Sequence, residues 1–242
     1  VAPHVDILEI GTPCIKHNGI KMLEALKAKF PKNKILVDLK TMDAGFYEAE
    51  PFYKAGADIC TVLGTADLGT IKGVVDVANK YGKECQVDLI NVTDKPARAK
   101  EAVKLGAHII GVHTGLDAQA AGGTPFIDLG AIAGLGMKCK ISVAGGIKPA
   151  TVKQVVAAGA NIVVAGAAIY GAADPAAAAA EITGLAREAD GGAGADGIKK
   201  FLPWILVVAA VLIGLSFMKN KPAEPAADAA APTEEAAPAA TE

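Results

Sequence analysis

The feature that most constrains the fold is a series of short apolar runs that recur along the first two thirds of the chain. The runs are rich in Val and Ile without polar alternation, a pattern typical of strands buried on both faces of a parallel sheet. They follow one another at intervals of roughly 23–30 residues, the length of a strand with its following helix. The seven runs are Val5–Ile10, Ile35–Leu39, Ile59–Leu63, Cys85–Ile90, Ile109–Val112, Lys140–Ala144 and Ile162–Ala165.

Helix-like stretches alternate with these runs, which indicates an α/β fold of the (β/α)8 TIM-barrel type. The clearest are Gly19–Phe30, Thr70–Tyr81, Lys95–Leu105, Thr151–Ala158 and the Ala-rich Asp174–Arg187. A closed barrel of this type needs eight strands, and residues 1–187 offer seven. Because the first run begins almost at residue 1, we expect a barrel that lacks its first β/α unit, encoded upstream. The alternative is an open, seven-stranded derivative.

The composition changes after residue 187. Residues 188–200 contain a Gly-rich stretch, which predicts a linker. Residues 201–218 are uncharged, apolar and flanked by lysines, and as a helix they would be about 27 Å long. That length predicts a transmembrane helix, with a buried core helix as the alternative. Residues 219–242, rich in Ala, Pro and Glu, predict a disordered acidic tail. We therefore expect a cytoplasmic catalytic domain anchored to a membrane by a C-terminal helix.

Charge and cysteine content narrow the class of protein. The formal net charge is -2 and aromatic residues make up 5% of the chain, which argues against a nucleic-acid partner. The four cysteines are scattered without a CxxC pair. They therefore predict buried free thiols rather than disulfides or a metal site.

Charged residues cluster at the end of the second apolar run. The run leads directly into Asp38, Lys40 and Asp43, spaced as Asp-x-Lys-x-x-Asp. Asp38 and Lys40 are two residues apart and point to the same side of a strand. Charges brought together in this way are costly unless they bind a metal, an anionic substrate or each other. Asp43 lies beyond the strand end, and its alternative role is that of a helix N-cap.

Glu9 closes the first apolar run, so it should lie beside Asp38 on the next strand. Two carboxylates on adjacent strand ends form an oxygen-rich site suited to Mg²⁺. The alternative is a Glu9–Lys40 ion pair without a metal. Lys40 should keep its charge among carboxylates, which suits stabilisation of an oxyanion better than Schiff-base chemistry.

Four further strand ends complete the candidate site. Asp88 and His113 end the fourth and fifth runs, where a histidine facing other titratable groups suits general acid–base catalysis. Two glycine-rich ends follow, where barrels of this type hold phosphate with backbone N–H groups. We therefore predict a phosphorylated small substrate. The residues of this expected cradle are Gly145, Gly146, Gly166 and Ala167.

Taken together, these motifs resemble the 3-hexulose-6-phosphate synthases, a family of barrels in the orotidine-monophosphate decarboxylase superfamily. The motifs are Glu9–Pro13, Asp38–Gly45, Asp88–Val92, His113–Gly115 and Ala144–Ile147. The resemblance covers residues 1–187. It implies a Mg²⁺-dependent aldol condensation of formaldehyde with D-ribulose 5-phosphate, giving D-arabino-hex-3-ulose 6-phosphate.

The same resemblance implies roles for the candidate residues. Glu9 and Asp38 would ligate Mg²⁺, and Lys40 would stabilise the charge of the enediolate. His113 and Asp88 would serve proton transfer and hydroxyl binding. The residues of the expected cradle would present backbone to the phosphate. In this superfamily the residue matching Asp43 reaches the site of the neighbouring subunit, which implies a homodimer.

Two other functions stay open. The 3-keto-L-gulonate-6-phosphate decarboxylases typically carry Glu-Leu-Thr-Gly in place of Asp88–Asn91, an Arg in place of Leu116 and another near Ala167. Those differences favour the synthases. The family's first strand also supplies a substrate-binding Asp, which this chain lacks. A non-enzymatic alternative is therefore an inactive truncated barrel that serves as a membrane-tethered binding module.

Overall fold

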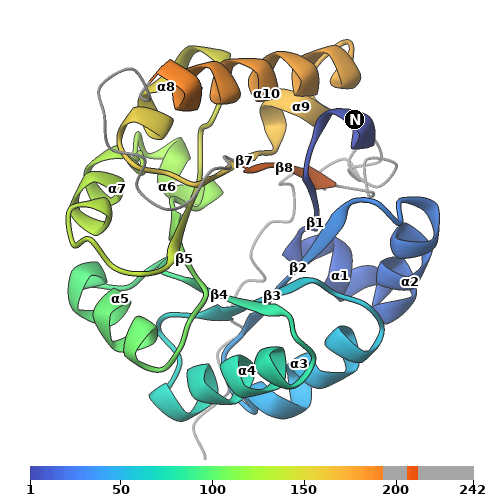
Figure 1. Cartoon of the computed structure of the whole chain (residues 1–242), viewed down its shortest axis with the longest axis vertical. Helices are drawn as coiled ribbons and strands as arrows, with labels where there is room; N and C mark the ends of the chain where they lie inside the picture. Colours follow the sequence, from blue (N-terminus) through green and yellow to red (C-terminus); the bar gives the residue numbers. More distant parts are fainter. Residues whose placement is uncertain (193–205, 212–242) are drawn as a thin grey trace, which may run out of the picture.

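Eight parallel strands form a closed barrel in the computed structural model, which describes residues 1–192 and 206–211. The strands follow one another around the barrel in chain order, and the helices surround them as an outer ring (Figure 1). The strands are β1 (Ile7–Ile10), β2 (Lys34–Thr41), β3 (Ile59–Leu63), β4 (Glu84–Asp88), β5 (Ile109–His113), β6 (Lys140–Ala144), β7 (Ile162–Ala165) and β8 (Leu206–Val211).

Helices connect the strands from β1 to β7 and close the outer layer after β7. A short 3₁₀ helix, Ala2–His4, precedes β1. The α-helices are α1 (Thr12–Asn18), α2 (Ile20–Lys29), α3 (Gly45–Lys54), α4 (Leu68–Lys80), α5 (Lys95–Lys104), α6 (Leu116–Ala120), α7 (Phe126–Ala133), α8 (Pro149–Ala157), α9 (Ala167–Tyr170) and α10 (Pro175–Gly192). The seven strands and five helices expected from the sequence are present. Helix α10 continues past Arg187 into the segment that we expected to be a linker.

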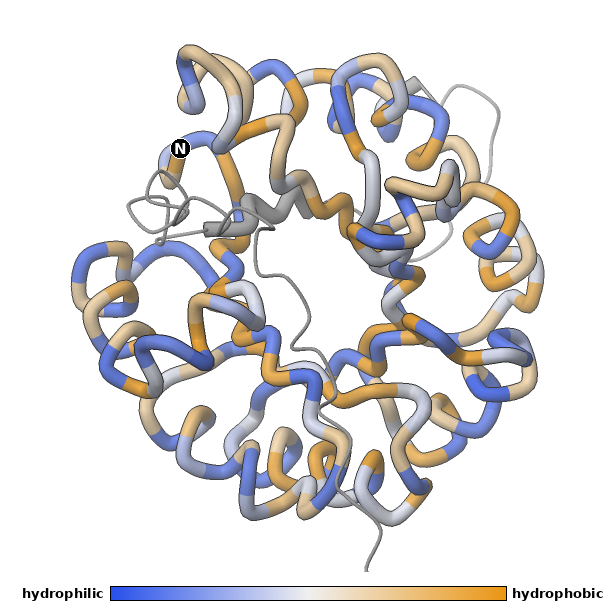
Figure 2. Tube along the Cα trace, turned by 180° about the vertical axis from the view of Figure 1, so that it is seen from behind, coloured by the Kyte–Doolittle hydropathy of each residue, from blue (hydrophilic) through white to orange (hydrophobic). Residues whose placement is uncertain are grey.

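The apolar core has two parts because alternate residues of each strand point to opposite sides of the barrel wall. The larger part lies between the strands and the helices. The smaller part lies inside the barrel, toward the N-terminal ends of the strands. In Figure 2, apolar segments concentrate on the barrel wall, and the helices of the outer ring carry many hydrophilic segments. The buried residues inside the barrel are Ile7, Leu36, Ile59, Ile109 and Ile162.

Ion pairs close the bottom of the barrel, at the N-terminal ends of the strands. The carboxylate of Glu84 accepts from Lys140 and lies 3.3 Å from Nζ of Lys34. Asp58 is paired with Lys27 and Lys83. In barrels of this type, this end serves stability, and the chemistry takes place at the opposite, C-terminal end of the strands.

Strand β2 is irregular near its C-terminal end. Val37 pairs with Cys60 and Thr41 with Val62, so three residues of β2, Asp38–Lys40, lie opposite the single residue Thr61 of β3. This segment of β2 is a bulge with two extra residues. Bulges often re-aim side chains beside active sites.

The expected transmembrane helix over residues 201–218 is wrong. Leu206–Val211, in the middle of that segment, form strand β8, which is parallel to both β7 and β1. In residues 1–192 and 206–211, the structure contains no helix with the length and apolar character needed to cross a membrane. The error has a physical cause, since a strand buried on both faces is as uniformly apolar as a membrane span. The expected membrane-anchored location is therefore also wrong.

The expectation of a barrel that lacks one strand is also wrong, because the barrel has eight strands and is closed. Strand β8 lies between β7 and β1, with Val164 and Ile7 both opposite Val208. The barrel is closed by a strand from the C-terminal part of the chain. The rest of the supposed membrane segment lies outside the described residues, as do residues 193–200 of the supposed linker and the tail over 219–242.

None of the four cysteines, all within the described residues, forms a disulfide bond. Cys14, Cys60 and Cys85 are buried in the core, and Cys139 is partly exposed.

Candidate active site

A pocket opens at the C-terminal ends of the barrel strands and gathers most of the residues singled out in the sequence. It encloses about 830 Å³, part of it open to solvent. Its wall includes the charged candidates from β1, β2, β4 and β5 and the backbone candidates that follow β6 and β7. These residues are Glu9, Asp38, Lys40, Asp88, His113, Gly145, Gly146, Gly166 and Ala167.

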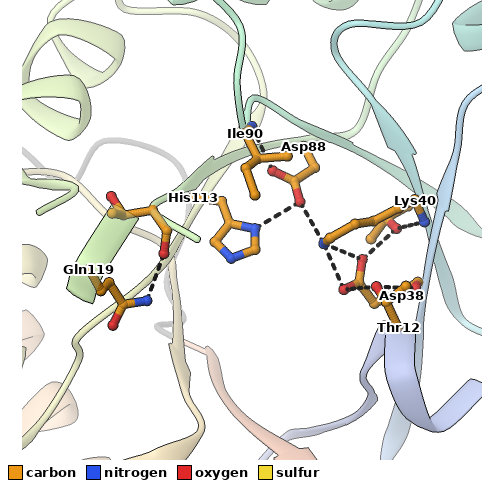
Figure 3. A network of polar contacts seen from close by, with 9 residues as sticks. Thr12, Asp38, Lys40, Asp88, Ile90, His113 and Gln119 are labelled. Atoms are coloured by element: carbon orange, nitrogen blue, oxygen red, sulfur yellow. Dashed lines mark hydrogen bonds and ion pairs between the residues drawn. The ribbon is translucent and has the colours of Figure 1, made fainter. Parts of the chain in front are cut away.

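A continuous row of charged contacts crosses the pocket from β2 to β5 (Figure 3). Lys40 Nζ lies 2.8 Å from Oδ2 and 3.1 Å from Oδ1 of Asp38. The same ammonium donates to Oδ2 of Asp88 at 3.0 Å. That oxygen lies 2.9 Å from Nδ1 of His113, and the other oxygen of Asp88 accepts the N–H of Ile90. One lysine therefore links two carboxylates, and the second carboxylate orients the histidine.

The surroundings favour the charged forms of Asp88 and Lys40. Burial alone would raise the pKa of Asp88, but the hydrogen bond and charge of His113, followed by the charge of Lys40, lower it. Burial would lower the pKa of Lys40, but Asp38 and Asp88 raise it well above the usual range. Lys40 therefore stays an ammonium ion, as the sequence analysis expected, and it is poorly suited to form a Schiff base.

Two threonine hydroxyls hold the carboxylate of Asp38 from the sides that Lys40 leaves open. Thr61 Oγ1 donates to Oδ1 at 2.8 Å. Thr12 Oγ1 lies 2.7 Å from Oδ2 and 2.9 Å from the carbonyl oxygen of the same aspartate. With the two contacts from Lys40, each carboxylate oxygen has two partners. Neither threonine was among the site residues predicted from the sequence. For Thr61, the sequence shows one hydroxyl residue inside the apolar run of β3, on the face of Ile59 and Leu63, which β propensity also explains.

The carboxyl group of Glu9 lacks the hydrogen bonds that hold Asp38. Its side chain makes no hydrogen bond to the described residues, and the charged groups near it are Asp38, Lys40 and Asp88. Burial, followed by the charge of Asp38, raises the pKa of Glu9 to about 8, although Lys40 acts in the opposite direction. In this part of the pocket, the carboxyl groups of Glu9, Asp38 and Asp88 therefore surround a single ammonium group, that of Lys40.

This donor set fits a divalent cation of the Mg²⁺ type. Such ions take one or two carboxylates and complete their coordination with water and substrate oxygens, so an all-protein cage is not needed. In the described part of the chain, no three His, Cys, Asp or Glu side chains converge as such a cage. The excess of carboxylates over ammonium groups around Glu9 is the feature that a divalent cation would neutralise. Because every oxygen of Asp38 is already hydrogen-bonded, a metal there would have to displace part of the contact with Lys40.

The glycines after β6 bring bare backbone to the far side of the pocket. Gly145 and Gly146 have φ angles of 112° and 68°, which disfavour any side chain. A Cβ at Gly145 would also lie 2.6 Å from the carbonyl oxygen of Thr114. Gly166 and Ala167 border the same pocket at the start of α9. The structure therefore brings these four residues together across the pocket from the charged row.

Asp43 is the one predicted site residue that the structure leaves outside the pocket. Its side chain is exposed, and Oδ1 accepts the N–H of Ala44 at 2.7 Å. The N-cap of α3 is Ala44, so Asp43 does not fill that role. Within one chain, Asp43 therefore has no contact with the charged row.

Comparison with known proteins agrees with this geometry. Residues 1–182 match the orotidine 5'-phosphate decarboxylase / HUMPS family. The chain belongs to this family. It is 81% identical over 187 residues to a 3-hexulose-6-phosphate synthase of Methylomonas aminofaciens, covering 77% of this chain and 90% of that protein. It is 50% identical over 184 residues to the synthase of Mycobacterium gastri, covering 75% and 87%. The family resemblance inferred from the motifs is thereby confirmed.

Solved structures of both candidate activities share this fold and differ in their sequence identity to the chain. A 3-hexulose-6-phosphate synthase from Salmonella typhimurium superposes with a TM-score of 0.76 at 41% identity, covering 78% of this chain and 90% of that one. A 3-keto-L-gulonate-6-phosphate decarboxylase from Vibrio cholerae gives 0.67 at 28% identity, covering 78% and 88%. The synthases are thus the more similar group in sequence, whereas the TM-scores of the two groups lie close together, at 0.73 for a second synthase and 0.72 for a KGPDC of Streptococcus mutans.

Proposed function

We propose that this chain condenses formaldehyde with D-ribulose 5-phosphate to D-arabino-hex-3-ulose 6-phosphate, with Mg²⁺ held by Glu9 and Asp38. The chain is an aldolase-type lyase with a phosphorylated sugar substrate. The observation that carries the proposal is the charged row Asp38–Lys40–Asp88–His113, which faces the glycine backbone across one pocket.

The reaction forms one carbon–carbon bond without net oxidation. A proton leaves C1 of the ketose, beside its carbonyl group, and gives an enediolate. That carbon attacks formaldehyde, and the resulting alkoxide takes up a proton. His113, whose Nδ1 lies against Asp88, would carry these protons. The ammonium of Lys40, fixed between Asp38 and Asp88, favours negative charge on the enediolate oxygens.

The proposed metal site and the proposed phosphate site would bind different parts of the same substrate. A Mg²⁺ ion on Glu9 and Asp38 would supply Lewis-acid stabilisation of two neighbouring substrate oxygens. Gly145, Gly146, Gly166 and Ala167 would hold the phosphate by backbone N–H groups. This arrangement fixes the reacting end of the sugar beside the charged row.

The test is formaldehyde consumption by the full chain with D-ribulose 5-phosphate, first with Mg²⁺ and then with EDTA. The full chain is needed because β8, at 206–211, belongs to the barrel. We expect turnover that EDTA abolishes and Mg²⁺ restores. Glu9→Gln and Asp38→Asn should weaken Mg²⁺ binding in calorimetry, with Glu24→Gln on the exposed face of α2 as the matched control. Turnover that is unaffected by EDTA would refute the metal role.

We further propose a homodimer in which Asp43 reaches the pocket of a second copy. Large apolar side chains are exposed near Asp43 on the end of β2, on α3 and at the start of α4. Helices α3 and α4 pack against each other, so these side chains lie on one side of the barrel. They are Met42 (52% exposed), Tyr47 (81%) and Leu68 (42%).

Subunit complementation tests this dimer. Asp43→Asn and Lys40→Met should each be nearly inactive alone, since each dimer lacks one group at both sites. Mixed after partial unfolding and refolding, they should recover activity, because one site of the mixed dimer has both groups intact. Light scattering gives the mass in parallel. A monomeric mass, or a mixture as inactive as its parts, would refute the shared site.

A further inference from the structure

The bulge of β2 leaves the backbone of Lys40 in an unusual conformation. Its φ is 48°, a left-handed value that residues with a Cβ rarely adopt. Lys40 also lies between the last regular pair, Val37 with Cys60, and the next, Thr41 with Val62. Its N–H therefore needs a partner other than the regular ladder of β3.

That partner is the side chain of Thr61 on β3. Oγ1 of Thr61 accepts the N–H of Lys40 at 2.9 Å and donates its own proton to Oδ1 of Asp38 at 2.8 Å. Thr61 is 1% exposed, so neither bond is readily replaced by water. One hydroxyl thus fixes the backbone of the lysine and the carboxylate of the aspartate relative to each other.

We infer that Thr61 is a positioning residue for the proposed condensation. Its hydroxyl holds the Lys40 ammonium and the Asp38 carboxylate in the geometry that the reaction needs. The inference deepens the proposed function and rests on it. Without the hydroxyl, a buried N–H and one carboxylate oxygen lose a partner, and the left-handed backbone at Lys40 loses its support. The ammonium at the end of that side chain would then no longer be held between the two aspartates.

The same strand pair offers a matched control. Thr41 is also 1% exposed, but its Oγ1 has no hydrogen-bond partner in the described part of the chain. Thr61→Val and Thr41→Val are the same chemical change at two buried β-branched positions. Thr61→Ser retains the hydroxyl and removes only a methyl group.

The experiment compares kcat and KM for the full-length wild type and these three variants with saturating Mg²⁺. We expect Thr61→Val to lower kcat by about 10- to 100-fold, the usual effect of losing a hydrogen bond to a charged group. KM for the sugar phosphate should change by less than about twofold, because the lost geometry acts on the reacting end. Thr61→Ser should recover most of kcat, and Thr41→Val should match the wild type. A wild-type kcat in Thr61→Val, or equal losses in Thr61→Val and Thr61→Ser, would overturn the inference.

A second readout does not depend on turnover. Amide hydrogen exchange at Lys40, followed by NMR, should speed up in Thr61→Val and stay at the wild-type rate in Thr41→Val. If the wild type itself does not consume formaldehyde, the proposed reaction fails, and exchange at Lys40 still tests the positioning by Thr61. Unchanged exchange in Thr61→Val would overturn the inference by itself.

Discussion

Glu9→Gln should remove a pH dependence of stability that the wild type shows in the absence of metal. The glutamine side chain resembles a protonated glutamate but does not titrate. In the wild type, burial and the charge of Asp38 raise the pKa of Glu9 from 4.5 to about 8. The folded protein therefore holds a proton that the unfolded chain releases between these two values.

The difference between the pKa values of Glu9 in the folded and unfolded states sets the sign and the upper limit of its effect on the free energy of unfolding. A carboxyl whose pKa is raised by folding makes its full contribution below pH 4.5, and that contribution is lost as the pH rises toward 8. The difference, 8 − 4.5 = 3.5 units, is equivalent to at most about 5 kcal/mol. Because charges around the site reorganise when Glu9 ionises, we expect a smaller realised change, on the order of 2 kcal/mol.

The assay is urea unfolding followed by far-UV circular dichroism, in EDTA, at several pH values from 5 to 8. The quantity compared is the free energy of unfolding of the wild type minus that of Glu9→Gln, which cancels the titration of other groups. This difference should fall as the pH rises. Glu24→Gln, an exposed substitution on α2, is the matched control. Parallel curves for the wild type and Glu9→Gln would refute the account of the site.

Three other substitutions test the site and the fold. Gly45→Ala should destabilise the protein by more than about 3 kcal/mol in urea unfolding, because the new Cβ would lie 2.2 Å from the carbonyl oxygen of Thr70. Asp88→Asn should lower kcat by about 100-fold or more, because the histidine loses its charged partner. Glu84→Gln should leave kcat unchanged and cost about 1–3 kcal/mol of stability by unpairing Lys140. The wild type should also lose stability below about pH 4.5 relative to Glu84→Gln, since lysine contacts outweigh burial and lower the pKa of Glu84.

The charged row could be predicted from the sequence because it depends on two regular properties of a parallel barrel. Strand ends lie at one edge, and residues two apart share a face. Asp38, Lys40, Asp88 and His113 each end a recognisable apolar run, so their meeting in one pocket follows. The role of Asp43 depends on a second copy in the proposed homodimer, so the strand pattern of one chain does not contain it.

The supporting hydroxyls could not be predicted in the same way. Threonine is a good strand former, so Thr61 in β3 is fully explained by β propensity alone. Its role depends on the bulge of β2, which arises from how Val37 and Thr41 pair with the neighbouring strand. Pairing across strands is a tertiary property that the periodicity of either strand does not contain.

Strand β8 also could not be predicted from its own sequence pattern, because its structure depends on pairing with other strands. An uncharged run of 18 residues fits a membrane-spanning helix by length and hydropathy. A central strand of a parallel barrel needs only about six such residues, and Leu206–Val211 lie within that run. What distinguishes the two is the presence of two unpaired strand edges to which the segment can bind. Strands β1 and β7 supply those edges, and their unpaired N–H and C=O groups would otherwise face solvent at a gap in the barrel. The seven-strand count was therefore itself the signal that an apolar segment elsewhere in the chain could complete the barrel.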